Sequence, residues 1–362
     1  MRAPAIRVPV SPDAASDAAP YVLVHLPATE MPGRAEALRR RVTRLARRAG
    51  ARLVLADVLP ELPPLVRRFL PDGAATAALL RDARTHALEA HAAHLRRAGI
   101  PTATVLLEGS AAVALVQEQL RGGYRLLVAG VPAAEARGEE ADAARRLARQ
   151  LVRKATCPVR LVRTGRDDVP RLRRRGGAPR VVAAVEAPLP GEGDTQVERA
   201  LLDLGRRILG EAAAQAQAAG ASLHVVHAWR ALGEGLLRTR QFAQADVARY
   251  RADLEREART AVEALVAGAA PSLAVPVASV TLVEGDPADA LPAAVAGGVD
   301  ALVVGTVART GLAGLLIGNT ADELIARAPC DVVIVKPSGF VSPIAPPGAT
   351  PEGRAEAVSA RA

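Results

Sequence analysis

The residues of this chain best suited to chemistry lie in one glycine-rich segment after residue 300. Its four glycines are Gly305, Gly311, Gly314 and Gly318. They follow the apolar run 301–304 and precede the pattern Thr320-x-x-Glu323, which predicts a capping box at a helix N-terminus. Glycines let backbone amides approach a ligand, and a strand end followed by a helix start is typical of a phosphate site. The sequence therefore predicts an anion site here.

The surrounding chain alternates apolar strand patterns with amphipathic helix patterns. In the first half, strands are expected at residues 21–26, 53–56, 102–107, 126–129 and 159–162, with helices at 34–49, 74–98 and 111–120 and one ending near 154. Such alternation requires βαβ crossovers and predicts a parallel sheet. The anion site would then lie at the carboxyl edge of that sheet.

The same order of features occurs twice, which indicates an internal duplication. The matched pairs are Ala49-Gly50-Ala51 with Ala219-Gly220-Ala221, Glu108-Gly109-Ser110 with Glu284-Gly285-Asp286, Gly122-Gly123 with Gly297-Gly298, and Cys157 with Cys330. We predict a disordered tail over residues 1–19, domains at 20–164 and 180–339, an Arg-rich linker at 165–179 and a second disordered tail at 340–362.

The two halves differ where the anion site would lie. After Gly130 the first half has few glycines, and its carboxylates are Glu135, Glu139, Glu140 and Asp142. Negative side chains in this expected loop would repel a phosphate. We therefore predict that only the second half retains an anion site.

Composition excludes several classes of protein. Aromatic residues make up 2% of the chain, which argues against an aromatic nucleic-acid platform, and two cysteines cannot form a disulfide framework. The N-terminus lacks a signal-peptide pattern, and no apolar run reaches the length of a membrane span. A soluble, cytoplasmic protein is expected. The net charge of +9 favours arginines on solvated helix faces, with DNA protection as an alternative.

Other features have weaker functional interpretations. His91 and His94 could hold a metal, but an exposed helix face is favoured. Trp229 could contact a ligand or cover the core, and the arginine run 171–175 suits a linker better than a phosphate-contacting arm. No nucleophile elbow, Walker loop or His-Glu-x-x-His motif is present, so no catalytic residue or metal site is predicted.

The second half resembles the universal stress protein family. Its nucleotide-binding members carry Gly-x2-Gly-x9-Gly-Ser/Thr, and this chain reads Gly305-x2-Ala308-x9-Gly318-Asn319. The duplication and the Gly-Thr-Val-x-Arg-Thr-Gly loop are similar to tandem members. The resemblance implies two Rossmann-like (adenine nucleotide alpha hydrolase-like) domains, each a five-stranded parallel sheet of order 3-2-1-4-5. It also implies ATP or another adenine nucleotide as ligand, with or without Mg²⁺.

The resemblance also implies the site residues. The phosphates would meet Gly305, Ala308, Arg309, Gly318, Asn319 and Thr320, while Glu186, His227 and Ala228 would lie near the base or ribose and Asp286 at the same rim. Two positions depart from the family pattern. Ala308 replaces a glycine and would cost about 1 kcal/mol if that position requires φ > 0. Asn319 replaces Ser/Thr but can still cap or donate.

The function predicted is that of a cytoplasmic stress-response protein, not an enzyme, that binds an adenine nucleotide through its second domain. Its first domain would be a degenerate partner, so that the chain forms a pseudo-dimer able to associate further into a homodimer. The alternatives are a nucleotide-free interaction or scaffold protein with unnamed protein partners, and a slow ATPase that needs Mg²⁺ and a positioned water. Membrane association and specific nucleic-acid binding are not expected.

Overall fold

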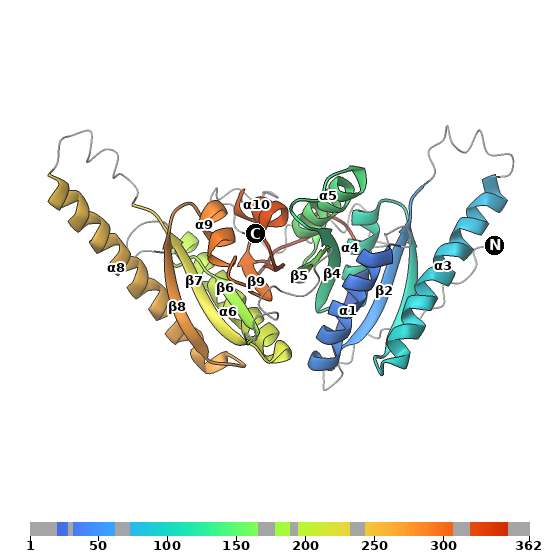
Figure 1. Cartoon of the computed structure of the whole chain (residues 1–362), viewed down its shortest axis with the longest axis horizontal. Coiled ribbons are helices and arrows are strands. Elements are labelled where there is room, and N and C mark those ends of the chain that lie inside the picture. The colour runs from blue at the N-terminus through green and yellow to red at the C-terminus, as the bar shows by residue number, and fades with distance from the viewer. Residues whose placement is uncertain are drawn as a thin grey trace. The chain divides into compact units, whose positions relative to one another are not determined.

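The structure is a computed structural model that describes residues 20–27, 32–61, 73–165, 178–188, 195–231, 243–306 and 319–346. The chain divides into two compact units. The first is built on strands β1 to β5 and the second on strands β6 to β10 (Figure 1). Each unit is an α/β layer structure in which helices cover a parallel sheet.

The first unit contains β1 (Tyr21–His25), α1 (Pro32–Ala49), β2 (Arg52–Leu59), α3 (Gly73–Arg97), β3 (Thr102–Glu108), α4 (Ala111–Gly122), β4 (Leu126–Pro132), α5 (Glu139–Lys154) and β5 (Val159–Thr164). All its strand pairs are parallel, in the order β3-β2-β1-β4-β5. The predicted order 3-2-1-4-5 is confirmed for this half.

The second unit contains β6 (Arg180–Ala184), α6 (Thr195–Ala219), β7 (Ser222–Trp229), α8 (Gln244–Ala269), the 3-10 turn η2 (Ala270–Ser272), β8 (Val277–Glu284), α9 (Pro287–Ala294), β9 (Ala301–Gly305), α10 (Asn319–Arg327) and β10 (Asp331–Val335). Its parallel order is β8-β7-β6-β9-β10, the same topology again. The strand order reverses between β6 and β9, and such switch points are where open α/β sheets place ligands.

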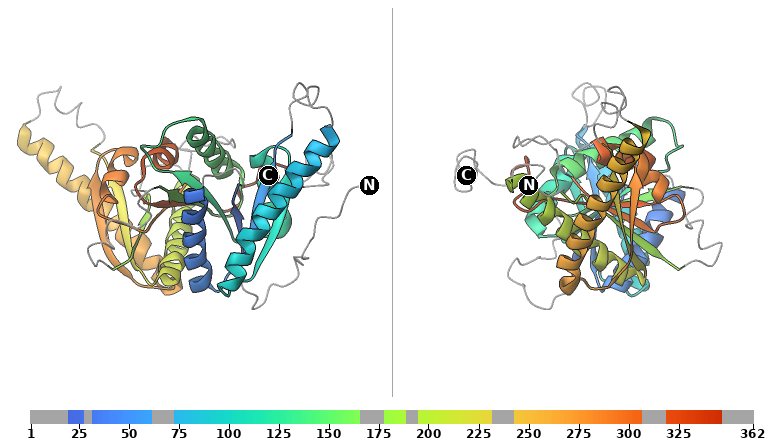
Figure 2. Two further views of the ribbon diagram at one scale, coloured as in Figure 1. Left: turned by 45° about the vertical axis from the view of Figure 1, so that its right-hand side comes forward. Right: turned by 90° about the vertical axis from the view of Figure 1, so that its left-hand side faces the viewer.

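Small side chains build the core of the second unit. Val181, Leu223, Ala301 and Val333 lie on one sheet face and pack against α6 and α8. Half of the α6 residues in this core are alanine, at Ala212, Ala213 and Ala216. Helices α9 and α10 belong to the opposite side of the same sheet (Figure 2). The low aromatic content therefore still yields a continuous buried core.

Repeated turns confirm the duplication in three dimensions. Gly50 and Gly220 each end a helix with positive φ, at 59° and 57°. This left-handed conformation is the C-terminal cap that glycine favours. Two further glycines match as well, because Gly109 donates its N–H to the Leu59 carbonyl and Gly285 donates to the Trp229 carbonyl, at 3.0 and 2.9 Å. Each of these hydrogen bonds links the carboxyl ends of two neighbouring strands.

The loop expected after Gly130 in the first unit is partly replaced by the end of β4 and the start of α5. β4 continues to Pro132 because it stays in register with β5 as far as Thr164. The acidic residues Glu139, Glu140 and Asp142 form the first turn of α5. Carboxylates are favoured there by the positive end of the helix dipole. The expected loop is therefore shorter, covers residues 133–138 and keeps only Glu135 of the four carboxylates.

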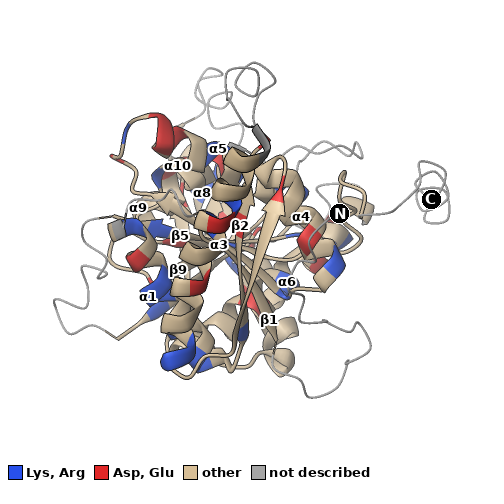
Figure 3. Ribbon diagram, turned by 90° about the vertical axis from the view of Figure 1, so that its right-hand side faces the viewer, with Lys and Arg blue, Asp and Glu red and all other residues tan. Residues whose placement is uncertain are grey.

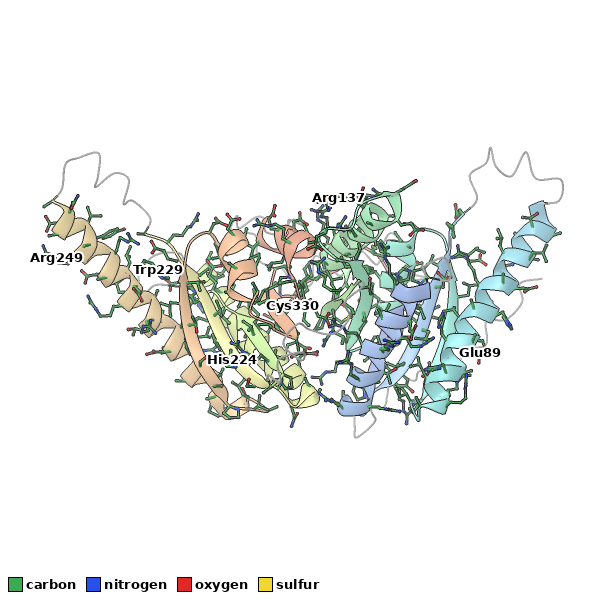
Figure 4. The ribbon with its side chains drawn as sticks, in the orientation of Figure 1. Glu89, Arg137, His224, Trp229, Arg249 and Cys330 are labelled. Carbon is green, nitrogen blue, oxygen red and sulfur yellow. The ribbon has the colours of Figure 1, made fainter. Side chains whose placement is uncertain are left out.

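No helix in the described part of the chain is long and apolar enough to cross a membrane. Both cysteines are buried and form no disulfide, and Cys330 directly precedes β10 (Figure 4). They occupy matching places before the last strand of each unit, as the duplication predicts.

Candidate functional site

The carboxyl ends of the five strands bring most of the described predicted residues to one rim of the second unit. Asp286 follows β8, His227 and Ala228 lie near the end of β7, and Glu186 follows β6. Gly305 ends β9, next to β6 in the sheet. Neighbouring strands are about 4.8 Å apart, so β8 and β9 are separated by about 14 Å along this rim. That span suits an extended small molecule.

Glu186 and His227 form the centre of this rim. His227 is buried, and its Nδ1 lies 2.9 Å from the Val185 carbonyl oxygen, so that nitrogen carries the hydrogen. Burial lowers the pKa of His227 more strongly than the Val185 hydrogen bond and the nearby Glu186 carboxylate raise it. A neutral imidazole beside a carboxylate can recognise polar edges of a base or sugar.

Asp286 has a structural task at the rim. Its side chain caps α9 by accepting the Ala288 N–H at 3.0 Å, and it pairs with Arg230 at 2.9 Å. Trp229 is the last residue of β7 and directly precedes Arg230 in the chain (Figure 4). Its side chain is half-buried. The sequence indicated the position of Asp286 but not its partner Arg230, which follows β7 and has no motif to mark it.

Gly305 is required for packing between β9 and α6. A Cβ atom added at Gly305 would lie 2.6 Å from Leu204 Cδ2 and 3.0 Å from Ile208 Cδ1, both on α6. These contacts are shorter than van der Waals distances, so a side chain at this position would displace Leu204 and Ile208. The described geometry gives this glycine a packing role. Its contact with a ligand through the backbone stays a prediction.

Gly305→Val should therefore lower the free energy of unfolding of the second unit by about 1–3 kcal/mol, because overpacking displaces Leu204 and Ile208. Urea unfolding monitored by circular dichroism measures this. Gly210→Val on α6 is the matched control, because a Cβ there meets nothing within 4 Å. Equal stability of the two variants would contradict the packing explanation.

The start of α10 lies after the glycine-rich segment. The described part of α10 starts at Asn319, so Thr320 is helical and does not occupy the N-cap position that the predicted capping box requires. Glu323 instead lies 3.6 Å from Arg327, one turn further on. The opposite charges attract along the helix surface. Ala308, Arg309 and Gly318 lie outside the described residues.

Two cations at this rim were not identified from the sequence. Lys336 follows β10 and is buried, with 4% of its surface exposed. Arg207 on α6 donates to the Lys336 carbonyl oxygen at 2.9 Å. The chain has only two lysines, Lys154 and Lys336, and this rarity is the one sequence feature that could have drawn attention to Lys336. The burial of Lys336 depends on tertiary packing and cannot be read from the sequence.

The corresponding rim of the first unit carries a buried charge cluster. Asp57 of β2, with 1% exposure, takes the position that His227 has in β7. Arg84 of α3 lies 3.2 and 3.1 Å from the two Asp57 oxygens, and His25 at the end of β1 is also buried. The two units therefore differ at equivalent rim positions, as well as after β4 and β9.

His91 on α3 and two arginines of α1 make contacts within the first unit. His91 Nδ1 lies 3.2 Å from Arg39, and Arg47 donates to the Ala98 carbonyl at 2.9 Å. In the described ranges, no three histidine, cysteine or acidic side chains gather as a metal site would require. Basic residues are prominent on α1 (Figure 3), and Arg39 and Arg47 help to fix that helix.

Fold and rim together define the class of protein. The chain is a duplicated, doubly wound α/β protein, and Glu186, His227 and Gly305 lie at the carboxyl edge of the sheet in its second unit. The universal stress protein family matches residues 26–163 and again residues 202–336. The chain therefore belongs to the universal stress protein family, with one domain of that family in each half.

Two relatives carry the same family name, and one solved structure shares the fold. A universal stress protein of Thermus aquaticus is 33% identical over 135 residues, which are 37% of this chain and 91% of that protein. Universal stress protein E of Salmonella typhi is 42% identical over 43 residues, and this match spans 12% of the chain and 14% of that relative. A crystal structure of a functionally unknown Pseudomonas aeruginosa protein has a TM-score of 0.56 at 24% identity, covering 88% of this chain and 93% of that one.

Proposed function

We propose that this stress-family protein binds one adenine nucleotide per chain, with ATP as the leading ligand, at the carboxyl rim of its second unit. It would act in the cytoplasm by binding, without a metabolic reaction of its own. The observation that carries the proposal is the convergence of Glu186, His227 and the end of β9 at the switch point of the sheet. Open α/β sheets bind ligands at such points.

The chemistry of the rim suits the two ends of a nucleotide. The Glu186 carboxylate and the neutral His227 ring, with Ala228 beside it, would recognise the base or ribose by hydrogen bonds. Backbone amides at the start of α10 would face the phosphates, since a helix N-terminus attracts anions. The phosphate contacts proposed from the family spacing are Gly305, Ala308, Arg309, Gly318, Asn319 and Thr320, and Asp286 marks the far end of the rim.

The first unit is a poor second site. Three carboxylates, Glu139, Glu140 and Asp142, lie in the first turn of α5, whereas α10 has only Asp322 there. Negative charge at the start of α5 competes with a phosphate for the same amides. The Asp57–Arg84 pair also takes the place of the neutral His227. We therefore expect one nucleotide, not two, per chain.

Titration of the purified protein with ATP, followed by calorimetry, tests the proposal. The parent should show saturable binding with a stoichiometry near one. Gly318→Glu should weaken binding by at least about tenfold. The new side chain would occupy the space between the backbone and the phosphates, and its negative charge would repel them. Gly297→Glu is the matched control, since Gly297 is exposed, has open space around it and precedes β9 at the opposite edge of the sheet.

Each other outcome selects another function. A parent protein without saturable ATP binding would contradict the proposal and favour the scaffold alternative. Release of phosphate that depends on Mg²⁺ would indicate a slow ATPase. Steeply salt-dependent binding to DNA that Gly318→Glu leaves unchanged would indicate protection of nucleic acid through the basic surface.

A further inference from the structure

Lys336 is a buried cation at the proposed nucleotide rim. Its residue surface is 4% exposed, and its Nζ lies 4.2 Å from the centroid of the Phe340 ring. Among the residues that the structure describes, no carboxylate forms an ion pair with this ammonium. The ring face attracts a cation but does not neutralise it.

Burial of an ammonium without an opposite charge is unfavourable. The effect is visible in the pKa of Lys336, which burial lowers to about 8. The amine therefore still carries its proton at neutral pH in most molecules. A bound anion would supply the missing charge and reverse this penalty, because a charge-assisted contact is strong in a water-poor site.

The backbone around Lys336 is fixed beside the start of the glycine-rich segment. Val335 pairs with Gly305 in the sheet, and the Thr306 N–H donates to the Val335 carbonyl at 3.1 Å. From the other side, Arg207 donates to the Lys336 carbonyl at 2.9 Å. The lysine is thus held at the point where the chain leaves β9.

The duplication offers an internal comparison. Arg163 stands at the same distance after Cys157 as Lys336 does after Cys330. Arg163 is also buried, and its guanidinium donates to the Pro132 carbonyl at the end of β4, at 2.9 Å. Both units therefore place a cation at this strand end. In the first unit it ties two strands together, whereas Lys336 makes no such bond to β9 among the described residues.

We propose that the Lys336 ammonium contacts the phosphate groups of the bound nucleotide, an inference that rests on the proposed function. Phe340 is a positioning residue that holds the side chain at the rim. The ligand chemistry required is a phosphate, and the base and ribose would be recognised elsewhere on the rim.

Affinities for ATP and for adenosine, measured on the full chain, test this contact. Lys336→Met keeps a long apolar side chain but removes the charge. It should weaken ATP binding about ten- to a hundredfold, the loss typical of a hydrogen bond to a charged group, and leave adenosine binding unchanged. Lys154→Met is the matched control, because it removes the only other lysine and should change neither affinity.

Stability separates a binding role from a structural one. Lys336→Met should unfold at the same or a higher temperature than the parent, since an uncompensated buried charge has been removed. Unchanged ATP binding by Lys336→Met would overturn the inference while leaving the proposed function intact. An equal loss of ATP and adenosine binding would also overturn it, because that pattern indicates a distorted site.

A second measurement applies even if the parent fails to bind ATP. Lys336 and Lys154 can be acetylated with acetic anhydride, and mass spectrometry of peptides then compares their rates of modification. Tripolyphosphate should slow acetylation of Lys336 relative to Lys154. Protection without ATP binding would support a phosphate site while rejecting the nucleotide. No protection by tripolyphosphate or ATP would overturn the inference.

Discussion

Replacing Arg84 by methionine should lower the free energy of unfolding of the first unit by about 3–5 kcal/mol, because the buried Asp57 carboxylate then loses its cation. Asp57 is 1% exposed and the Arg84 side chain 17%. One guanidinium nitrogen lies within 3.2 Å of both carboxylate oxygens and 3.1 Å from the Val58 carbonyl oxygen. Methionine fills similar space but cannot neutralise the anion.

Urea unfolding of the full chain, with a probe in each unit, measures this loss. Arg81→Met is the matched control, because Arg81 lies one turn earlier on α3 and pairs with Glu108 at the surface. Exposed pairs contribute about 1 kcal/mol or less. The double variant Asp57→Leu, Arg84→Met should recover most of the stability, since neither charge remains. Equal losses for Arg84→Met and Arg81→Met would refute the buried-pair explanation.

This pair also bears on function. In the second unit, equivalent strand and helix positions are occupied by His227 and Leu254, so no comparable ion pair forms there. The surface pair is kept in both units, as Arg81 with Glu108 and as Arg251 with Glu284. The duplicated domains therefore share their edge contacts and differ at the rim. That difference agrees with one unit having a supporting role and the other a binding role.

The second large effect should appear when the pH is lowered. Burial lowers the pKa of His25 to about 4, more strongly than Asp57 raises it, and Arg84 lowers it further. Unfolded histidine has a pKa of about 6.5, so the unfolded chain takes up the proton first as the pH falls. Stability contributed by neutral His25 is complete above about pH 6.5. It should fall by about 3 kcal/mol between pH 6.5 and 4.

His25→Gln should flatten this part of the pH profile, because glutamine is polar but takes up no proton. The measurement is the free energy of unfolding at intervals from pH 7 to 4, for the variant and the parent. His86→Gln on the exposed side of α3 is the control and should follow the parent. A variant profile parallel to that of the parent would show that His25 is not the group responsible.

The sequence predicted the architecture well because its signals are local. Apolar runs such as 301–304 and 332–335 are short, continuous and rich in valine, which is typical of parallel strands buried on both faces. Gly50 and Gly220 marked helix ends because a left-handed residue after a helix favours glycine. Boundaries were less certain, because β4 extends to Pro132 through pairing with β5 rather than through its own composition.

The sequence predicts which edge of the sheet carries the candidate residues, but not their contacts. Parallel strands end at one edge, so the positions of Glu186, His227 and Asp286 follow from the order of elements. Their partners do not, because Asp286 contacts Arg230 across 56 residues of chain. The capping box failed because a four-residue pattern does not fix where a helix begins. The phosphate contacts Ala308, Arg309 and Gly318 lie outside the described residues and stay predictions.

The sequence by itself determined that this protein is a tandem α/β chain with one glycine-rich segment at a strand end. Repeats, periodicity and turn residues are properties of neighbouring residues, so they can be read without coordinates. Only the tertiary structure decided that Gly305 packs against α6, that Asp57 is paired with Arg84 and that Lys336 is buried at the rim. These properties depend on contacts between residues far apart in the chain, which packing alone brings together.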